Sequence, residues 1–111
     1  MKTLLIAFTL ISSVLGYNDQ TATVKVWGNC GMCKSRIEKA LEIDGVNKAE
    51  WDVETKMLTL SYDFNTINLE QIQQAIATAG HDTEKFRAAD SMYAKLPDCC
   101  SYDRKKDKTD N

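Results

Sequence analysis

Hydrophobic residues recur along the chain with two different periods, and these periods predict five secondary-structure elements, to which a last strand after Gly80 is added. Three segments alternate polar and apolar residues, which is typical of half-buried strands. Two further segments place apolar residues three and four positions apart, which is typical of helices that bury one face. In chain order, the prediction is a strand over 21–27, a helix from Cys33 to Glu42, strands over 46–54 and 57–63, a helix over 69–79 and a strand over 81–87.

The ends of the predicted helices carry matching signals. Asp44-Gly45 follows the first helix and Gly80 follows the second, and glycine is common just past a helix end. Asn68 stands where its side chain would cap the second helix. Two amphipathic helices bury their apolar faces when both pack on one face of an antiparallel sheet, so the pattern predicts an α+β fold.

The start of the chain differs from this domain. Lys2 precedes an apolar run over residues 4–11, and Val14 and Gly16 place small residues at the −3 and −1 positions, as in a secretory signal peptide. The apolar run is shorter than the roughly 20 residues that span a bilayer. We therefore expect an exported protein, periplasmic or secreted, without membrane insertion after cleavage. Its predicted parts are a signal peptide over 1–16, a linker over 17–20, a domain over 21–87 and a cysteine-containing polar tail over 88–111.

Length and charge narrow the classes of function. Cleavage after Gly16 leaves 95 residues with a net charge of −3, which suits one small core and a monomer. A mildly acidic chain with dispersed charges is unsuited to nucleic acid, because phosphate binding requires a basic stripe. His81 is the only histidine, so no set of nucleophile, base and orienting residue can be assembled, and we expect no enzyme.

The segment Cys30-Gly31-Met32-Cys33 is the strongest chemical signal, and it lies where a predicted strand leads into a helix. Two thiols separated by two residues can converge on one ion. Cys33 falls in the first helical turn, where the helix dipole favours the thiolate. Paired thiolates without a carboxylate select soft ions such as Cu(I) or Hg(II), and Zn(II) when further ligands join.

The chain resembles the heavy-metal-associated domain family, which includes copper chaperones, metal-binding domains of copper-exporting ATPases and the periplasmic mercury-binding protein. The resemblance implies a ferredoxin-like βαββαβ sandwich, with two helices on one face of a four-stranded antiparallel sheet. It places Cys30 and Cys33 on the metal-ligand positions, and it implies a partner, either a metal-transporting ATPase or another cysteine-rich metal-transfer protein. It covers residues 21–87 and is carried by Val24–Leu41, Asp44-Gly45-Val46, Trp51-Asp52-Val53, Leu58-Leu60-Tyr62 and Ile76–Gly80.

Two positions qualify the resemblance. The family motif is Gly-Met-X-Cys-X-X-Cys, but this chain has Trp27-Gly28 where the family has Gly-Met, so the methionine beneath the loop is missing. In the family, the residue that follows Gly80 sits beside the metal, which makes His81 a candidate third ligand through a neutral ring nitrogen. The alternative is a solvent-facing histidine at a turn.

Cys99-Cys100 lies outside the resemblance. Adjacent cysteines rarely bridge each other because the ring is strained. The pair would chelate a second soft ion, hand metal to the first loop, or pair with Cys30 and Cys33 on oxidation. A tail disulfide, within one chain or between chains, is a further alternative, and the sequence leaves all four open.

The sequence thus predicts a carrier that captures a soft ion, Cu(I) foremost, between Cys30 and Cys33 and transfers it by ligand exchange. One alternative is scavenging of Hg(II) by the same pair. An alternative of another class is a thiol–disulfide oxidoreductase, which Trp27 and the Cys-Gly-X-Cys sequence favour. Such enzymes place a cis-proline opposite the dithiol, whereas Pro97, the single proline of this chain, stands beside the terminal cysteines.

Overall fold

A computed structural model describes residues 19–104 of the chain. The predicted signal peptide, residues 17–18 of the predicted linker and residues 105–111 lie outside the described residues. Within the described range, no helix is both long and apolar enough to cross a membrane.

The strands form one antiparallel sheet whose inner face is apolar. Leu58 and Leu60 of the central strand are buried, and Leu58 pairs with Val24 on one side and Trp51 on the other. The alternation predicted from the sequence is therefore confirmed in all three strands. In the spatial order β1-β3-β2, they are β1 (Asp19–Lys25), β3 (Met57–Asp63) and β2 (Val46–Trp51).

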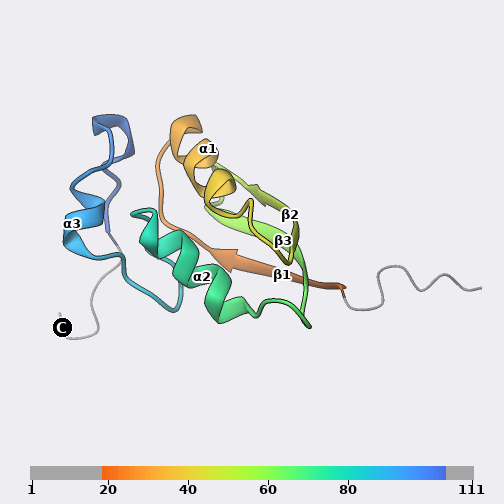
Figure 1. Cartoon of the computed structure of the whole chain (residues 1–111). Coiled ribbons are helices and arrows are strands. Elements are labelled where there is room, and N and C mark those ends of the chain that lie inside the picture. The colour runs from red at the N-terminus through yellow and green to blue at the C-terminus, as the bar shows by residue number, and fades with distance from the viewer. Residues whose placement is uncertain (1–18, 105–111) are drawn as a thin grey trace, which may run out of the picture.

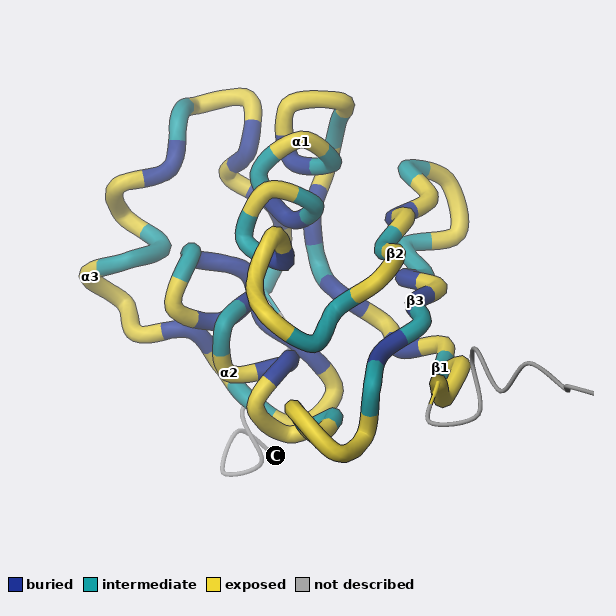
Figure 2. Tube along the Cα trace, turned by 45° about the vertical axis from the view of Figure 1, so that its right-hand side comes forward, coloured by how far each residue is buried: buried dark blue, intermediate teal, exposed yellow. Residues whose placement is uncertain are grey.

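Two helices cover this apolar face (Figure 1): α1 (Gly31–Ala40) and α2 (Leu69–Thr78). They bury Ile37 and Ile76 in one core with the strands. Asn68 caps α2 as predicted, because its side chain accepts from the Gln71 backbone while the Gln71 side chain accepts from the Asn68 backbone. Figure 2 shows the buried positions gathered where the helices meet the sheet.

The connection between β2 and β3 is longer than predicted. We expected β2 to continue to Glu54, but it ends at Trp51. The Asp52 carboxylate accepts hydrogen bonds from the backbone N–H groups of Glu54 and Thr55, each at 2.8 Å. This side-chain turn replaces strand pairing, and Lys56 closes it with a φ of 66°.

The sheet has three strands, and the prediction of a fourth strand over 81–87 is wrong. Among the described residues, this segment contributes one isolated bridge, between Val26 and Thr83. A tight turn follows immediately, because the Thr83 N–H donates to the Phe86 carbonyl at 2.8 Å. The chain therefore turns away from β1 before a ladder can form.

The Asp82 carbonyl accepts from the Trp27 N–H at 2.9 Å, but several N–H groups of this segment bond to side chains instead of a neighbouring strand. The Asp82 N–H donates to the Tyr102 hydroxyl at 2.9 Å, and the Lys85 N–H donates to the Gln73 side chain at 2.9 Å. The Ala88 N–H donates to the Asp82 carboxylate at 2.7 Å. Because buried backbone donors need partners of some kind, these side chains remove the requirement for a fourth strand.

The segment after residue 88 folds back onto the domain. It contains α3 (Asp90–Tyr93) and the short 3-10 helix η1 (Asp98–Cys100). Leu96, Cys100 and Tyr102 are buried in the same core as the sheet and helices. Figure 1 shows this segment, in blue, beside the beginning of α1, so the described chain packs as one body through residue 104.

The Tyr102 hydroxyl provides a test of this packing, because it donates to the Gly80 carbonyl at 2.7 Å and accepts from Asp82. Tyr102→Phe leaves two buried backbone groups without a partner. We expect the free energy of unfolding, measured by urea denaturation, to fall by about 1–3 kcal/mol. Tyr62→Phe is the control, because no hydrogen bond of the Tyr62 hydroxyl is found within residues 19–104, and its change should stay below about 0.5 kcal/mol. Equal losses would contradict the assignment.

Candidate metal centre

The loop between β1 and α1 rests on the indole ring of Trp51. This ring is buried, and its Nε1 donates to the Val26 carbonyl at 3.0 Å. A Cβ atom on Gly28 would lie 3.0–3.2 Å from the ring and from the Cys33 Cβ, so the loop backbone approaches the ring as closely as only glycine allows. Trp51 fills the space beneath the loop, which explains how the loop packs without a methionine there.

Cys30 is the N-cap residue of α1, and its thiol is the activated one. The backbone N–H groups of Cys33 and Met32 at the helix start favour the thiolate and lower the pKa of Cys30 to about 7. Cys33 itself is buried, and its sulfur accepts from the Asn29 N–H at 3.2 Å. The two predicted ligands therefore differ, with one thiol half-buried at the surface and one beneath it.

The terminal cysteine pair lies beside this loop. The Cys30 thiol donates to the Cys99 carbonyl at 3.3 Å, and the sulfurs of Cys30, Cys99 and Cys100 all lie within 4.8 Å of one another. Desolvation raises the pKa of Cys100, and so does the neighbouring Cys33 thiol, while desolvation and the Cys30 thiol raise that of Cys99. All four cysteines are free thiols, and the structure brings the terminal pair together with Cys30.

Sequence reasoning considered the terminal pair but did not place it. The signal that indicates its position is the apolar content of the tail, because Leu96 and Tyr102 flank the two cysteines and both are buried. Large apolar side chains in a short polar tail predict that the tail packs somewhere. Only the folded structure shows that it packs on the Cys30 loop.

His81 faces the core and not the solvent, so the alternative of a solvent-facing histidine is wrong. Its Nδ1 lies 2.8 Å from the Trp27 carbonyl oxygen, and its ring stacks on Tyr102 with the centroids 5.2 Å apart. Burial lowers the pKa of His81, and its buried Nε2 has no hydrogen-bond partner within the described chain. The imidazole is not part of the group of sulfurs that converges around Cys30.

Comparison with known proteins identifies relatives of the part of the chain that carries this loop. A family model described as the heavy-metal-associated domain matches residues 29–82. The copper chaperone CopZ of Staphylococcus aureus (strain bovine RF122 / ET3-1) is 40% identical over 55 residues, which is 49% of this chain and 81% of the chaperone. The family match contains Cys30 and Cys33 but ends before Cys99 and Cys100.

Solved structures with similar folds support the same relationship. Oxidised MerP from Ralstonia metallidurans CH34 superposes with a TM-score of 0.57 at 28% identity, covering 60% of this chain and 94% of MerP. A copper-binding domain from HMA7, a P-type ATPase, superposes with a TM-score of 0.56 at 29% identity, covering 58% of this chain and 89% of that domain. The similarity thus spans nearly the whole of each of these two structures.

The difference between the thiols predicts their order of alkylation. Because its pKa is lowered to about 7, Cys30 should react with iodoacetamide at half its maximal rate near that pH. Cys99 and Cys100, whose pKa values are raised, should react fast only in more alkaline solution. Mass spectrometry of peptides from a pH series measures each site. In urea, the difference should vanish, because unfolded thiols share a pKa of about 8.5. Faster alkylation of Cys99 than of Cys30 at neutral pH would contradict this order.

Proposed function

This chain belongs to the heavy-metal-associated domain family, and on that premise we propose that it captures a soft metal ion, Cu(I) foremost, between Cys30 and Cys33 and passes it to a partner protein. The observation that carries the proposal is the position of these two thiols. Cys30 is the N-cap residue of α1, where nearby backbone N–H groups lower the pKa of its thiol, and Cys33 lies one turn on with its sulfur beneath the loop.

The ligand atoms account for the class of metal. Within the described residues, the side chains that converge with Cys30 are cysteines and include no carboxylate. Thiolates without oxygen ligands favour Cu(I) and Hg(II), and also Zn(II) in four-coordinate sites. The Staphylococcus aureus relative is named a copper chaperone, which supports Cu(I) as the first choice among these ions.

Transfer proceeds by exchange of thiolate ligands. A thiolate of the partner binds the ion from the side of Cys30, which is accessible, and the ion passes through a three-coordinate state. The loop thiolates then leave, and they take up protons equivalent to those that the partner thiols released. The ion keeps its oxidation state, so no oxidant or reductant is required. The copper-binding domain of the P-type ATPase supports a metal-transporting ATPase as partner, and a cysteine-rich transfer protein is the alternative.

Capture of Hg(II) is the second candidate. It is favoured by the similarity to MerP, which spans 94% of that protein, and the same two thiolates would hold the ion. Chains isolated from cells grown with added copper and with added mercury distinguish the two. Copper enrichment in the isolated chain supports the first proposal, and mercury enrichment at equal exposure supports the second.

Enzymatic thiol–disulfide exchange is the alternative that the relatives argue against. The relatives with similar sequences, such as the Staphylococcus aureus protein, are copper chaperones, which are non-enzymatic metal carriers, so the expectation that the chain is no enzyme is confirmed. In this proposal the reduced cysteines are metal ligands, and they do not catalyse disulfide exchange in a substrate.

Export belongs to the proposal as well. The pattern over residues 1–16 supports a signal peptide, and we infer that the mature chain is a monomer in the periplasm or outside the cell. Sequencing the amino terminus of protein recovered from outside the cytoplasm should find Tyr17 as the first residue. A chain that keeps Met1 and stays in the cytoplasm would contradict export while leaving metal capture intact.

Metal capture is tested by titrating the reduced full chain with Cu(I) in the presence of a competing chelator. Cys30→Ser removes a direct ligand, so we expect its affinity to fall at least as far as the roughly 10- to 100-fold loss typical of removing an outer partner of a ligand. Ser35→Ala is the matched control, because this exposed residue lies on the same helix and carries no sulfur. Unchanged Cu(I) affinity in Cys30→Ser would overturn the proposal.

A further inference from the structure

The segment that carries Cys99 and Cys100 lies against the start of α1, where the metal loop ends. η1 contacts α1 directly, and Figure 1 shows the two elements side by side at the same end of the molecule. The Asn29 side chain, from the loop, donates to the Cys99 carbonyl at 3.5 Å. The family match ends at residue 82, so this contact lies outside the matched region.

The segment is held in place by buried contacts on both sides of the cysteines. Before them, Leu96 packs into the core, and after them Tyr102 stacks on His81 and bonds to the backbone of Gly80. Such contacts fix the backbone of η1 from its two ends. A tail that reached the loop only through exposed side chains would not be ordered in this way.

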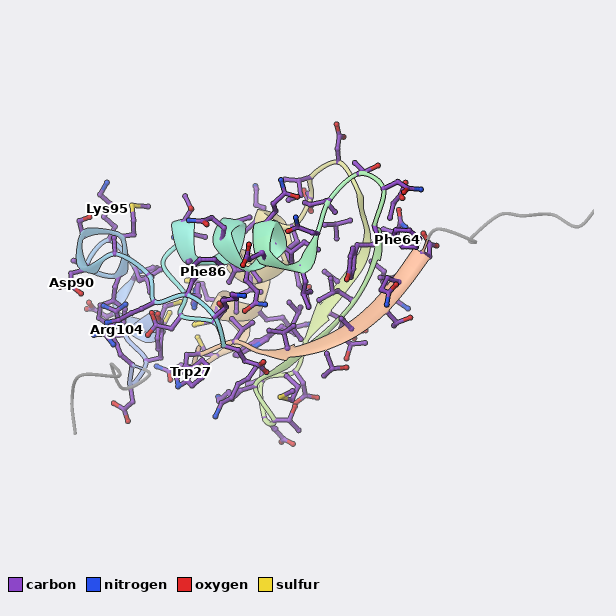
Figure 3. All side chains as sticks on the ribbon, turned by 90° about the horizontal axis from the view of Figure 1, so that it is seen from below. Trp27, Phe64, Phe86, Asp90, Lys95 and Arg104 are labelled. Atoms are coloured by element: carbon purple, nitrogen blue, oxygen red, sulfur yellow. The ribbon has the colours of Figure 1, made fainter. Side chains whose placement is uncertain are left out.

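Arg104 holds the end of the segment against the domain through ion pairs and a hydrogen bond. Its guanidinium lies 2.7 Å from the Asp82 carboxylate and 2.9 Å from that of Asp90, and it also donates to the Ala88 carbonyl at 2.6 Å. Figure 3 shows Arg104 and Asp90 together at the end of the molecule opposite Phe64. Asp82 is fully buried, and a charge-assisted fork to a buried carboxylate is among the stronger side-chain contacts.

The positions of the sulfurs suit a metal site. For metal–sulfur bonds of about 2.3 Å, the sulfurs of a three- or four-thiolate site are about 3.8–4.0 Å apart. The sulfurs of Cys30, Cys99 and Cys100 already lie within 4.8 Å of one another, so shifts of about 1 Å or less bring them to bonding distance. Cys33 lies outside this group of three but close to it, because it is buried at the start of α1, which η1 contacts.

The sulfur cluster is surrounded by further sulfur and is partly shielded from solvent. Cys33 and Cys100 have no exposed surface, and the Cys99 sulfur lies 3.5 Å from the thioether sulfur of Met32. Sulfur-rich surroundings favour a soft cation over a hard one. The tail therefore provides two additional thiols near the ion, like the cysteine pair of a partner protein during transfer.

We propose that Cys99 and Cys100 are metal ligands as well, and that with Cys30 and Cys33 they close a multithiolate site around one soft cation. The proposal rests on the proposed function in taking Cys30 and Cys33 as ligands. The tail then occupies the place of the partner's thiolates and retains the ion. A partner removes the ion only by displacing the tail, one thiolate at a time, with no change in oxidation state.

The test uses Cd(II), one equivalent per reduced full chain, with a phosphine as reductant. X-ray absorption counts the sulfurs bound to the metal, and chelator competition gives the affinity. We expect three or four sulfurs in the natural chain and two in Cys99→Ser/Cys100→Ser. A thiolate held beside the ion acts at high effective concentration, so the double variant should bind Cd(II) at least roughly tenfold more weakly.

Cys99→Ser keeps the test valid if loss of the buried Cys100 disturbs folding. Cys99 is exposed, so this variant should fold normally by circular dichroism and lose one sulfur from the count. Two sulfurs in the natural chain and no change of affinity in either variant would overturn the closed site while leaving the proposed function standing. Two Cd(II) ions per chain would also overturn it, because the pairs would then bind separately.

The loop pair distinguishes failure of the two proposals. Cys30→Ser/Cys33→Ser should lose Cd(II) binding by a larger factor than the tail variant does. If this variant binds Cd(II) as tightly as the natural chain, the proposed function is wrong and so is the shared site. If the loop variant loses Cd(II) binding but the tail variants keep the affinity and the sulfur count of the natural chain, the loop cysteines bind the ion and the tail cysteines are not ligands.

Discussion

The packing of the loop backbone on the Trp51 ring is the constraint on which the candidate metal centre depends. The ring is held from below by the sheet, where Trp51 pairs with Leu58, and from the side by its bond to the Val26 carbonyl. Gly28 leaves no room between loop and ring. Because the loop backbone is held against this ring, Cys30 lies at the start of α1, where backbone N–H groups favour its thiolate. The electrostatics of the site thus arise from backbone geometry and not from charged neighbours.

The second constraint is the way in which the segment over 81–88 satisfies its backbone groups. Beyond its short contact with Val26 and Trp27, its N–H groups bond to the side chains of Tyr102, Gln73 and its own Asp82. Two of the groups that hold this segment, Tyr102 and Arg104, belong to the tail. The side of β1 that a fourth strand would occupy is therefore linked to the C-terminal segment, and this linkage carries Cys99 and Cys100 to the loop.

The result is one cluster of thiols with unequal environments. Cys30 is accessible and readily ionised, whereas Cys33 and Cys100 are enclosed. In the ligand exchange proposed for this chain, an incoming thiolate would approach the ion at Cys30 while the enclosed thiols hold it. Burial would keep the ion bound, and the position of Cys30 at the start of α1 would make that thiol reactive.

The order of the first five elements, the cap at Asn68 and the paired thiols of a soft-metal loop were evident from the sequence alone. Each depends on residues close together in the chain, where periodicity, capping and spacing act. The tertiary structure decided the missing fourth strand, the burial of His81 and the approach of Cys99 to Cys30, which are 69 residues apart. These depend on which distant group satisfies a buried N–H or fills a space, and a local pattern holds no information about a partner that only folding brings near.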